Sequence, residues 1–160
     1  MALQERHKNR LRSWIRVTMV FIAVILLFFA VVIPFANNAI ALGVEKELKA
    51  LPLPQNTELI ESTSKAGKLV GNGNGMQYFG AILIKSDLSP EELDAYYQEY
   101  RTGQFDCLIS AQLDNDILAV EHGDLAFRHD EYGVGYYIVY TWGNAPGWLQ
   151  TWLDTDLRGH

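Results

Sequence analysis

A short segment rich in glycine and asparagine is the most unusual local feature of the sequence. It reads Gly71-Asn72-Gly73-Asn74-Gly75 and leads directly into an apolar stretch. Glycine permits backbone conformations in which successive amides point at one anion, so the segment is a candidate ligand-binding loop. It lacks the Gly-Lys-Ser/Thr ending of a phosphate-binding loop, and it precedes a strand where such a loop would precede a helix. Asn-Gly pairs are also typical of hairpin turns, and a structural turn is the competing interpretation.

Aromatic side chains gather near the C-terminus. Trp142 and Trp148 are candidates to line a groove for a peptide or a glycan, because aromatic rings bury a large apolar surface on contact. The pattern also fits packing of a last helix on a sheet, since Trp148 and Trp152 recur at helical spacing. Tyr140 and Trp142 alternate as side chains on one face of a strand do. The sequence leaves both interpretations open.

The histidines and acidic residues lack the spacing of a metal site. His122, His129 and His160 do not fall into the compact patterns that bind zinc. The acidic run at Asp114 and Asp116 ends too soon to place oxygen ligands at alternate positions around calcium. We therefore expect no metal site and no cofactor, and we interpret these residues as solvated turns.

Groups that could act as nucleophile, acid or base are present without a catalytic motif. Ser110 and Cys107 do not lie in sequence contexts that activate a serine or a cysteine. Cys107 is the only cysteine, so no disulfide can form within the chain, and a buried thiol is the expected state. The alternative is an enzyme in which Asp154 or Asp156 acts together with a histidine.

The elements that must position these residues follow from apolar periodicity. Ser89-Pro90-Glu91-Glu92 is a capping box with proline at the first helical position, and it predicts a helix over 90–101. Further elements are expected as strands over 57–63, 76–85, 105–113, 117–121, 125–128 and 136–142, and as a short helix after Pro146. The strand at 76–85 is apolar on both faces and is expected to be central in the sheet. The last two strands are expected to form a hairpin. The segment 105–113 is also compatible with a helix. This order predicts an α+β domain with an antiparallel sheet and two helices.

An uncharged apolar run near the N-terminus predicts a membrane anchor. It begins at Val17 and ends at Phe35, and 14 of its 19 residues are Val, Ile, Leu or Phe. A helix of that length spans about 28 Å, which matches the hydrocarbon core of a bilayer. Trp14 and Arg16 stand where the headgroups would lie, and the basic residues before the run orient the N-terminus towards the cytoplasm.

The apolar run has two other interpretations, a cleaved signal peptide and a buried core helix. The small-x-small pattern Ala39-Ile40-Ala41 would suit cleavage of a signal peptide, but the run exceeds the usual 7–15 apolar residues, so an uncleaved signal-anchor is favoured. A buried core helix fits poorly, because bulky apolar residues cover all its faces. The expected organisation is a basic cytoplasmic segment (1–16), the anchor (17–35), a tether (36–57) and an extracytoplasmic domain (58–160). Within the tether, residues 45–51 can extend the helix for a turn or two before Pro52 and Pro54 stop it.

Charge is distributed unevenly along the chain. Residues 1–16 carry five basic side chains and one acid, whereas residues 36–160 carry 8 basic and 18 acidic side chains, a formal charge of −10. An acidic domain of this kind argues against nucleic-acid binding. Cationic or neutral partners are expected.

Two stretches resemble a family of small uncharacterised single-pass membrane proteins of Gram-positive bacteria. They read AGKLVGNGNGMQYFGAILIK over 66–85 and YTWGNAP over 140–146. The resemblance implies a bacterial cell envelope, with the outer domain facing the cell wall, and it brings no activity and no site residues.

Two functional hypotheses follow. The first is a binding or interaction module held at the outer face of the membrane, whose partners are the lipid bilayer and another envelope protein or a cell-wall component. The second is an envelope hydrolase that uses the Asp and His residues named above. The absence of a catalytic motif favours the first.

Overall fold

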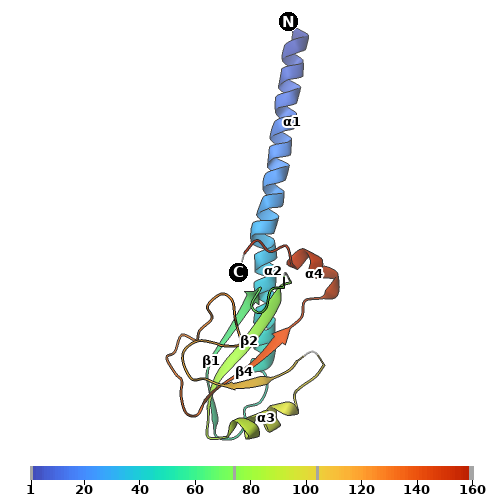
Figure 1. Ribbon diagram of the computed structural model, residues 1–160. Coiled ribbons are helices and arrows are strands. Elements are labelled where there is room, and N and C mark those ends of the chain that lie inside the picture. The colour runs from blue at the N-terminus through green and yellow to red at the C-terminus, as the bar shows by residue number, and fades with distance from the viewer. Residues whose placement is uncertain (1, 74, 104, 159–160) are drawn as a thin grey trace.

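A long helix leads into an α+β domain built on a four-stranded antiparallel sheet (Figure 1). The computed structural model describes residues 2–73, 75–103 and 105–158 of the 160-residue chain. The elements in chain order are α1 Ala2–Leu27, η1 Phe28–Val32, α2 Ile33–Lys49, β1 Thr57–Gly67, β2 Gln77–Ser86, α3 Pro90–Gln98, β3 Leu108–Ala111, β4 Tyr136–Gly143 and α4 Gly147–Leu153. Within these residues one helix, Arg6–Lys49, is long and apolar enough to cross a membrane.

The helix runs without a break from α1 into α2. η1 is a π-helical turn in which the N–H of Ile33 donates to the carbonyl of Phe28, five residues earlier. Pro34 follows and has no N–H to donate, and in a regular α-helix its ring would clash with the carbonyl four residues before it. The wider π turn relieves this conflict, so the proline neither ends nor interrupts the helix.

The sheet has the strand order β1-β2-β4-β3. β1 and β2 form a hairpin in which Gly67 pairs with Gln77, β4 pairs with the other side of β2, and β3 is the outer partner of β4. β2 is buried from Tyr78 to Ile84, which confirms the central strand predicted over 76–85. β3 confirms a strand, not a helix, within 105–113.

The prediction of strands over 117–121 and 125–128 is wrong. An isolated bridge joins Asp116 to Ala126, and β4 pairs with β2 and β3 instead of forming a hairpin with 125–128. Ile117 and Phe127 are buried there because they cover a face of the sheet, whereas Leu118 is exposed, and alternating burial alone does not require strand pairing.

Residues 112–135 form this cover, which we call the covering loop. Its Ile117 and Phe127 pack in one cluster with Phe79 and Leu83 of β2. The carboxylate of Glu61 on β1 accepts hydrogen bonds from the backbone N–H groups of Arg128 and His129, each at 3.0 Å. These bonds hold the loop to the edge strand in place of a strand ladder.

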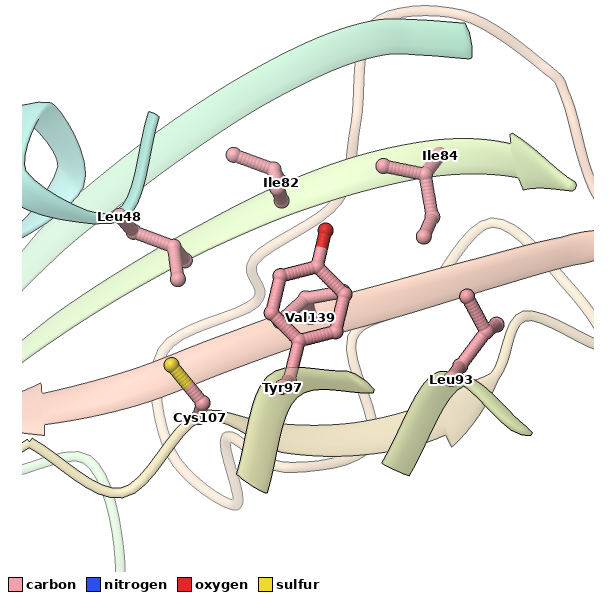
Figure 2. Close-up of a cluster of buried hydrophobic side chains, with 7 residues drawn as sticks. All are labelled: Leu48, Ile82, Ile84, Leu93, Tyr97, Cys107 and Val139. Carbon is pink, nitrogen blue, oxygen red and sulfur yellow. The ribbon is translucent and has the colours of Figure 1, made fainter. Parts of the chain in front are cut away.

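Helices cover the opposite face of the sheet. Figure 2 shows the core on that side, where side chains from α2, α3, β2, β4 and the start of β3 converge. Its members are Leu48, Ile82, Ile84, Leu93, Tyr97, Cys107 and Val139. α3 begins with the predicted capping box, in which Ser89 and Glu92 each accept the other's backbone N–H.

The segment 36–49, expected as part of a tether, is instead the body of α2 and part of the domain core. Ala41, Val44 and Leu48 are buried against the sheet at helical spacing. The carboxylate of Glu45 accepts hydrogen bonds from Ser62 (2.6 Å) and Ser64 (2.7 Å) of β1. The described part of the domain therefore contains the helices α2, α3 and α4, one more than predicted, and residues 50–56 connect α2 to β1.

Two glycines let α2 approach the sheet closely. A Cβ atom built on Gly80 of β2 would lie 2.7 Å from the backbone nitrogen of Glu45, and one on Gly143 of β4 would lie 2.2 Å from a methyl group of Val44. Any side chain at Gly80 would push the helix backbone away from the strand. Gly43, on the outer side of α2, has open space around the same position.

We expect alanine substitutions at these glycines to act in opposite directions. Gly80→Ala should lower the free energy of unfolding by about 1–3 kcal/mol, because the new methyl group overlaps backbone that cannot move freely. Gly43→Ala should raise it by up to about 1 kcal/mol, because alanine is the better helix former and meets no neighbour. Chemical unfolding of the full chain in detergent, followed by tryptophan fluorescence, measures both. Equal effects of the two substitutions would contradict the close packing of α2.

Candidate functional site

The candidate residues gather where the long helix enters the domain. This end, which we call the near end, consists of the β1–β2 loop (68–76), α4 and the tail 154–158 (Figure 1). The tail folds back on the start of α2. The near end therefore lies beside residues 34–38, where the apolar run finishes.

A buried asparagine joins α4 and the tail to the start of β2. Asn37 of α2 is fully buried, and its amide group donates to the carbonyl of Leu153 (3.1 Å) and to the carboxylate of Asp156 (2.7 Å). Its amide oxygen accepts from the Tyr78 hydroxyl at 2.8 Å. Burial, with the nearby carboxylates of Asp154 and Asp156, raises the pKa of Tyr78 to about 12, so the hydroxyl remains a donor.

An ion pair completes this network. Burial alone would raise the pKa of Asp156, but hydrogen bonds from Arg158 and Asn37 outweigh it, and the pKa of Asp156 lies below its usual value. The Arg158 guanidinium contacts the Asp156 carboxylate at 2.6 Å and also donates to Asn38 (2.9 Å) and to the carbonyl of Pro34 (3.2 Å). The tail is thus bound to the helix on both sides of Asn37.

The glycine- and asparagine-rich loop lies at the near end, and side chains of the protein itself occupy several of its amides. Gly71 N–H donates to the Glu121 carboxylate at 2.9 Å, and Met76 N–H donates to that of Asp154 at 2.7 Å. Gly71 has a φ of +67°, which glycine adopts without strain. The loop closes the β1–β2 hairpin, and its contacts with Glu121 and Asp154 join it to the covering loop and to α4. Asn72, Gly73 and Gly75 are exposed, and Asn74 lies outside the described residues.

The structure separates the two candidate tryptophans. Trp142 packs edge-on against Phe79, with ring centroids 4.9 Å apart, in the cluster beneath the covering loop. Trp148 is 79% exposed on α4, and Trp152, one turn later, is 56% exposed. Leu153 is the α4 residue that turns inward. Packing on the sheet therefore explains Trp142, but it does not explain Trp148 or Trp152.

The groups proposed for hydrolysis are engaged in contacts that join segments of the fold. Asp154 accepts from Met76, and Asp156 accepts from Asn37, as described above. His122 contacts the carbonyl of Gly71 at 3.0 Å, and His129 contacts the Glu61 carboxylate at 2.7 Å. His160 lies outside the described residues. Among the described residues, no group of three or more His, Cys, Asp or Glu side chains is placed to hold a metal ion.

The single thiol is deeply buried. Cys107 is 0% exposed and lies in the core of Figure 2, beside Tyr97. Burial is the main cause that raises the pKa of Cys107, to about 11, so the protonated thiol predominates at neutral pH. A role as a nucleophile is not supported by this environment.

A groove of about 460 Å³ lies beside α2, between the helix, the end of β4 and residues 100–105, and was not predicted from the sequence. Its lining is mainly apolar and aromatic, with one acidic side chain, that of Glu47. The residues are Ile40, Gly43, Val44, Glu47, Leu51, Tyr100, Thr102, Phe105, Gly143 and Asn144. The groove exists because α2 packs on the sheet and because Gly43 presents no side chain, and neither fact follows from a segment interpreted as a tether.

No family model, no curated protein and no solved structure matches the chain. Any assignment of function therefore rests on the sequence and on the geometry described above.

Two adjacent asparagines provide a test of the near-end network. Asn37→Ala should lower the free energy of unfolding by about 2–4 kcal/mol, because it leaves the Tyr78 hydroxyl buried without its acceptor and removes one hydrogen bond to the Asp156 carboxylate, which keeps those from Arg158. Asn38→Ala should cost about 1 kcal/mol or less, because it removes an exposed hydrogen bond to Arg158. Urea unfolding in detergent compares the two. Similar costs would show that the network contributes little.

Proposed function

We propose that the chain is a single-pass membrane protein with a cytoplasmic N-terminus, and that its domain is an interaction module of the bacterial cell envelope. The observation that carries the proposal is the uncovered apolar surface of the long helix. From Val17 to Phe35 the helix has no charged residue, the most apolar 18-residue window has a mean hydropathy of 3.0, and large side chains such as Phe21 and Phe35 are 64% and 75% exposed. Such a surface is stable in lipid and not in water.

The orientation rests on charge. Five basic residues precede the apolar run within residues 1–16, and cytoplasmic flanks of membrane helices carry such an excess. The bacterial envelope rests on the sequence resemblance alone. An interaction role, as opposed to catalysis, is supported by the engagement of Asp154, Asp156, His122 and His129 in structural contacts.

The groove along α2 is the best candidate for the interaction surface. It is large enough for several side chains of a partner, and Ile40, Leu51 and Phe105 give it apolar walls. Glu47 adds a negative charge at its rim, within a domain that is itself acidic. We propose as its occupant a segment of another envelope protein that carries an apolar side chain next to a Lys or Arg.

Cysteine labelling tests the orientation. Lys46→Cys places a thiol on the exposed side of α2, and Ser13→Cys places one before the apolar run. A membrane-impermeant maleimide added to intact protoplasts should label Lys46→Cys, and it should label Ser13→Cys only after lysis. The unsubstituted protein should give a low background because Cys107 is buried. Labelling of Ser13→Cys in intact cells would overturn the proposed orientation.

Filling the groove tests the interaction role. Gly43→Trp places a large side chain in the groove, whereas Gly43→Ala leaves most of it open. We expect affinity capture from detergent extracts to lose its enriched partner with Gly43→Trp and to keep it with Gly43→Ala. Leu42→Trp, on the exposed surface next to the groove, is the matched control and should also keep it.

The background for this capture is the same anchor fused to an unrelated domain. Two results would contradict the interaction role of the groove: no enrichment over this background, or equal loss of the partner with Leu42→Trp.

A further inference from the structure

Three large apolar side chains are exposed together at the near end. Trp148 is 79% exposed, Trp152 is 56% exposed and Leu157 is 69% exposed. Trp148 and Trp152 are four residues apart and so share one face of α4. The packing of the domain leaves this face of α4 and the nearby Leu157 uncovered.

Hydrogen bonds fix how far this surface lies from the end of the apolar run. Arg158 donates to the carbonyl of Pro34, within the run, and Asn37, two residues after the run ends at Phe35, donates to the carbonyl of Leu153. Two residues of α-helix correspond to about 3 Å. The polar headgroup layer on one side of a bilayer is roughly 5–8 Å deep. A helix that spans the membrane over 17–35 would therefore place α4 within the headgroup layer.

Basic side chains meet in a second pocket at the same end. This pocket of about 260 Å³ is lined by Lys65, Lys68, His122 and Arg158, together with Ala66, Gly67, Leu69, Met76 and Gly123. The lining contains no acidic side chain. Residues 36–160 carry a formal charge of −10, so a pocket lined by basic side chains stands out from the rest of the domain.

We propose that the near end is a second membrane contact, which docks the domain on the anionic surface of the bilayer that its own helix crosses. Trp148, Trp152 and Leu157 enter the headgroup layer, as aromatic residues at membrane interfaces do. The lysines of this pocket, Lys65 and Lys68, receive the phosphate of an anionic phospholipid, whereas Arg158 is paired with Asp156 and forms part of the pocket wall. This inference rests on the proposed membrane anchor. It adds a fixed position and orientation of the domain on the membrane surface.

Fluorescent labels at equally exposed positions test the docking. Leu157→Cys and Leu113→Cys carry the same dye; Leu157 is 69% exposed at the near end, and Leu113 is 70% exposed beyond β3, at the opposite end of the sheet. The full chain is reconstituted in nanodiscs of phosphatidylcholine containing one quarter phosphatidylglycerol. One protein per disc removes any contribution from a second copy.

We expect iodide to quench the label at 157 at least roughly three-fold less than the label at 113, because a dye in the headgroup layer is shielded from water. Equal quenching would overturn the docking. A third label at Val24→Cys, inside the apolar run, reports on the anchor separately. If Val24 is shielded and position 157 is not, the docking fails and the anchor stands; if Val24 is quenched, the anchor fails as well.

The pocket is tested by charge and by lipid composition. Lys65→Gln combined with Lys68→Gln should restore quenching at 157, and so should discs of phosphatidylcholine alone. The control is Lys46→Gln with Lys49→Gln, which removes two lysines from α2 roughly 16–21 Å beyond Phe35 and should leave quenching unchanged. Shielding that survives both the lysine substitutions in the pocket and the neutral lipid would overturn the phosphate site.

Discussion

The close contact between α2 and the sheet is the constraint on which the rest of the structure depends. Gly80 and Gly143 allow the helix backbone to lie almost on the strands, and Glu45 fixes it sideways to Ser62 and Ser64. This contact turns the continuation of an apolar helix into part of a domain core. It also creates the groove beside the same helix. The packing of α2 on the sheet therefore determines both how the domain is attached and where its best candidate binding surface lies.

The polar network at the near end depends on the same contact. Asn37 can bind Tyr78, Leu153 and Asp156 at once only because α2 places it over the end of β2. Each member of this network is buried or paired, so hydrogen bonds and an ion pair tie residues 154–158 to the helix. Residues 34–38, at the end of the apolar run, are thus in direct contact with the last part of the chain.

The sequence predicted the features that depend on local patterns. The uncharged run from Val17 to Phe35, the capping box at Ser89 and the doubly apolar strand over 76–85 each carry their signal in a few consecutive residues, and the structure contains all three elements. The sequence predicted two strands in the covering loop. Apolar and polar residues alternate in the same way in a loop packed against a sheet and in a strand of the sheet.

The candidate site was harder to predict, because it depends on contacts between distant segments. Ala41, Val44 and Leu48 do show helical spacing, but the prolines at 52 and 54 suggested a tether. No local sequence pattern indicates that a helix packs against Gly80. Asn37 and Asp156 are 119 residues apart, so their pairing has no sequence signal. The glycine loop and the tryptophans are unusual in the sequence, but their surroundings follow only from the fold.

The unbroken passage from α1 into α2 makes the helix and the sheet mechanically one piece. A flexible linker would let the domain swivel, whereas here any tilt or rotation of α1 turns the sheet through the same angle. Each residue of an α-helix advances the chain by about 100° around its axis. The number of residues between the apolar run and Asn37 therefore sets the angle about the helix axis at which the groove along α2 faces.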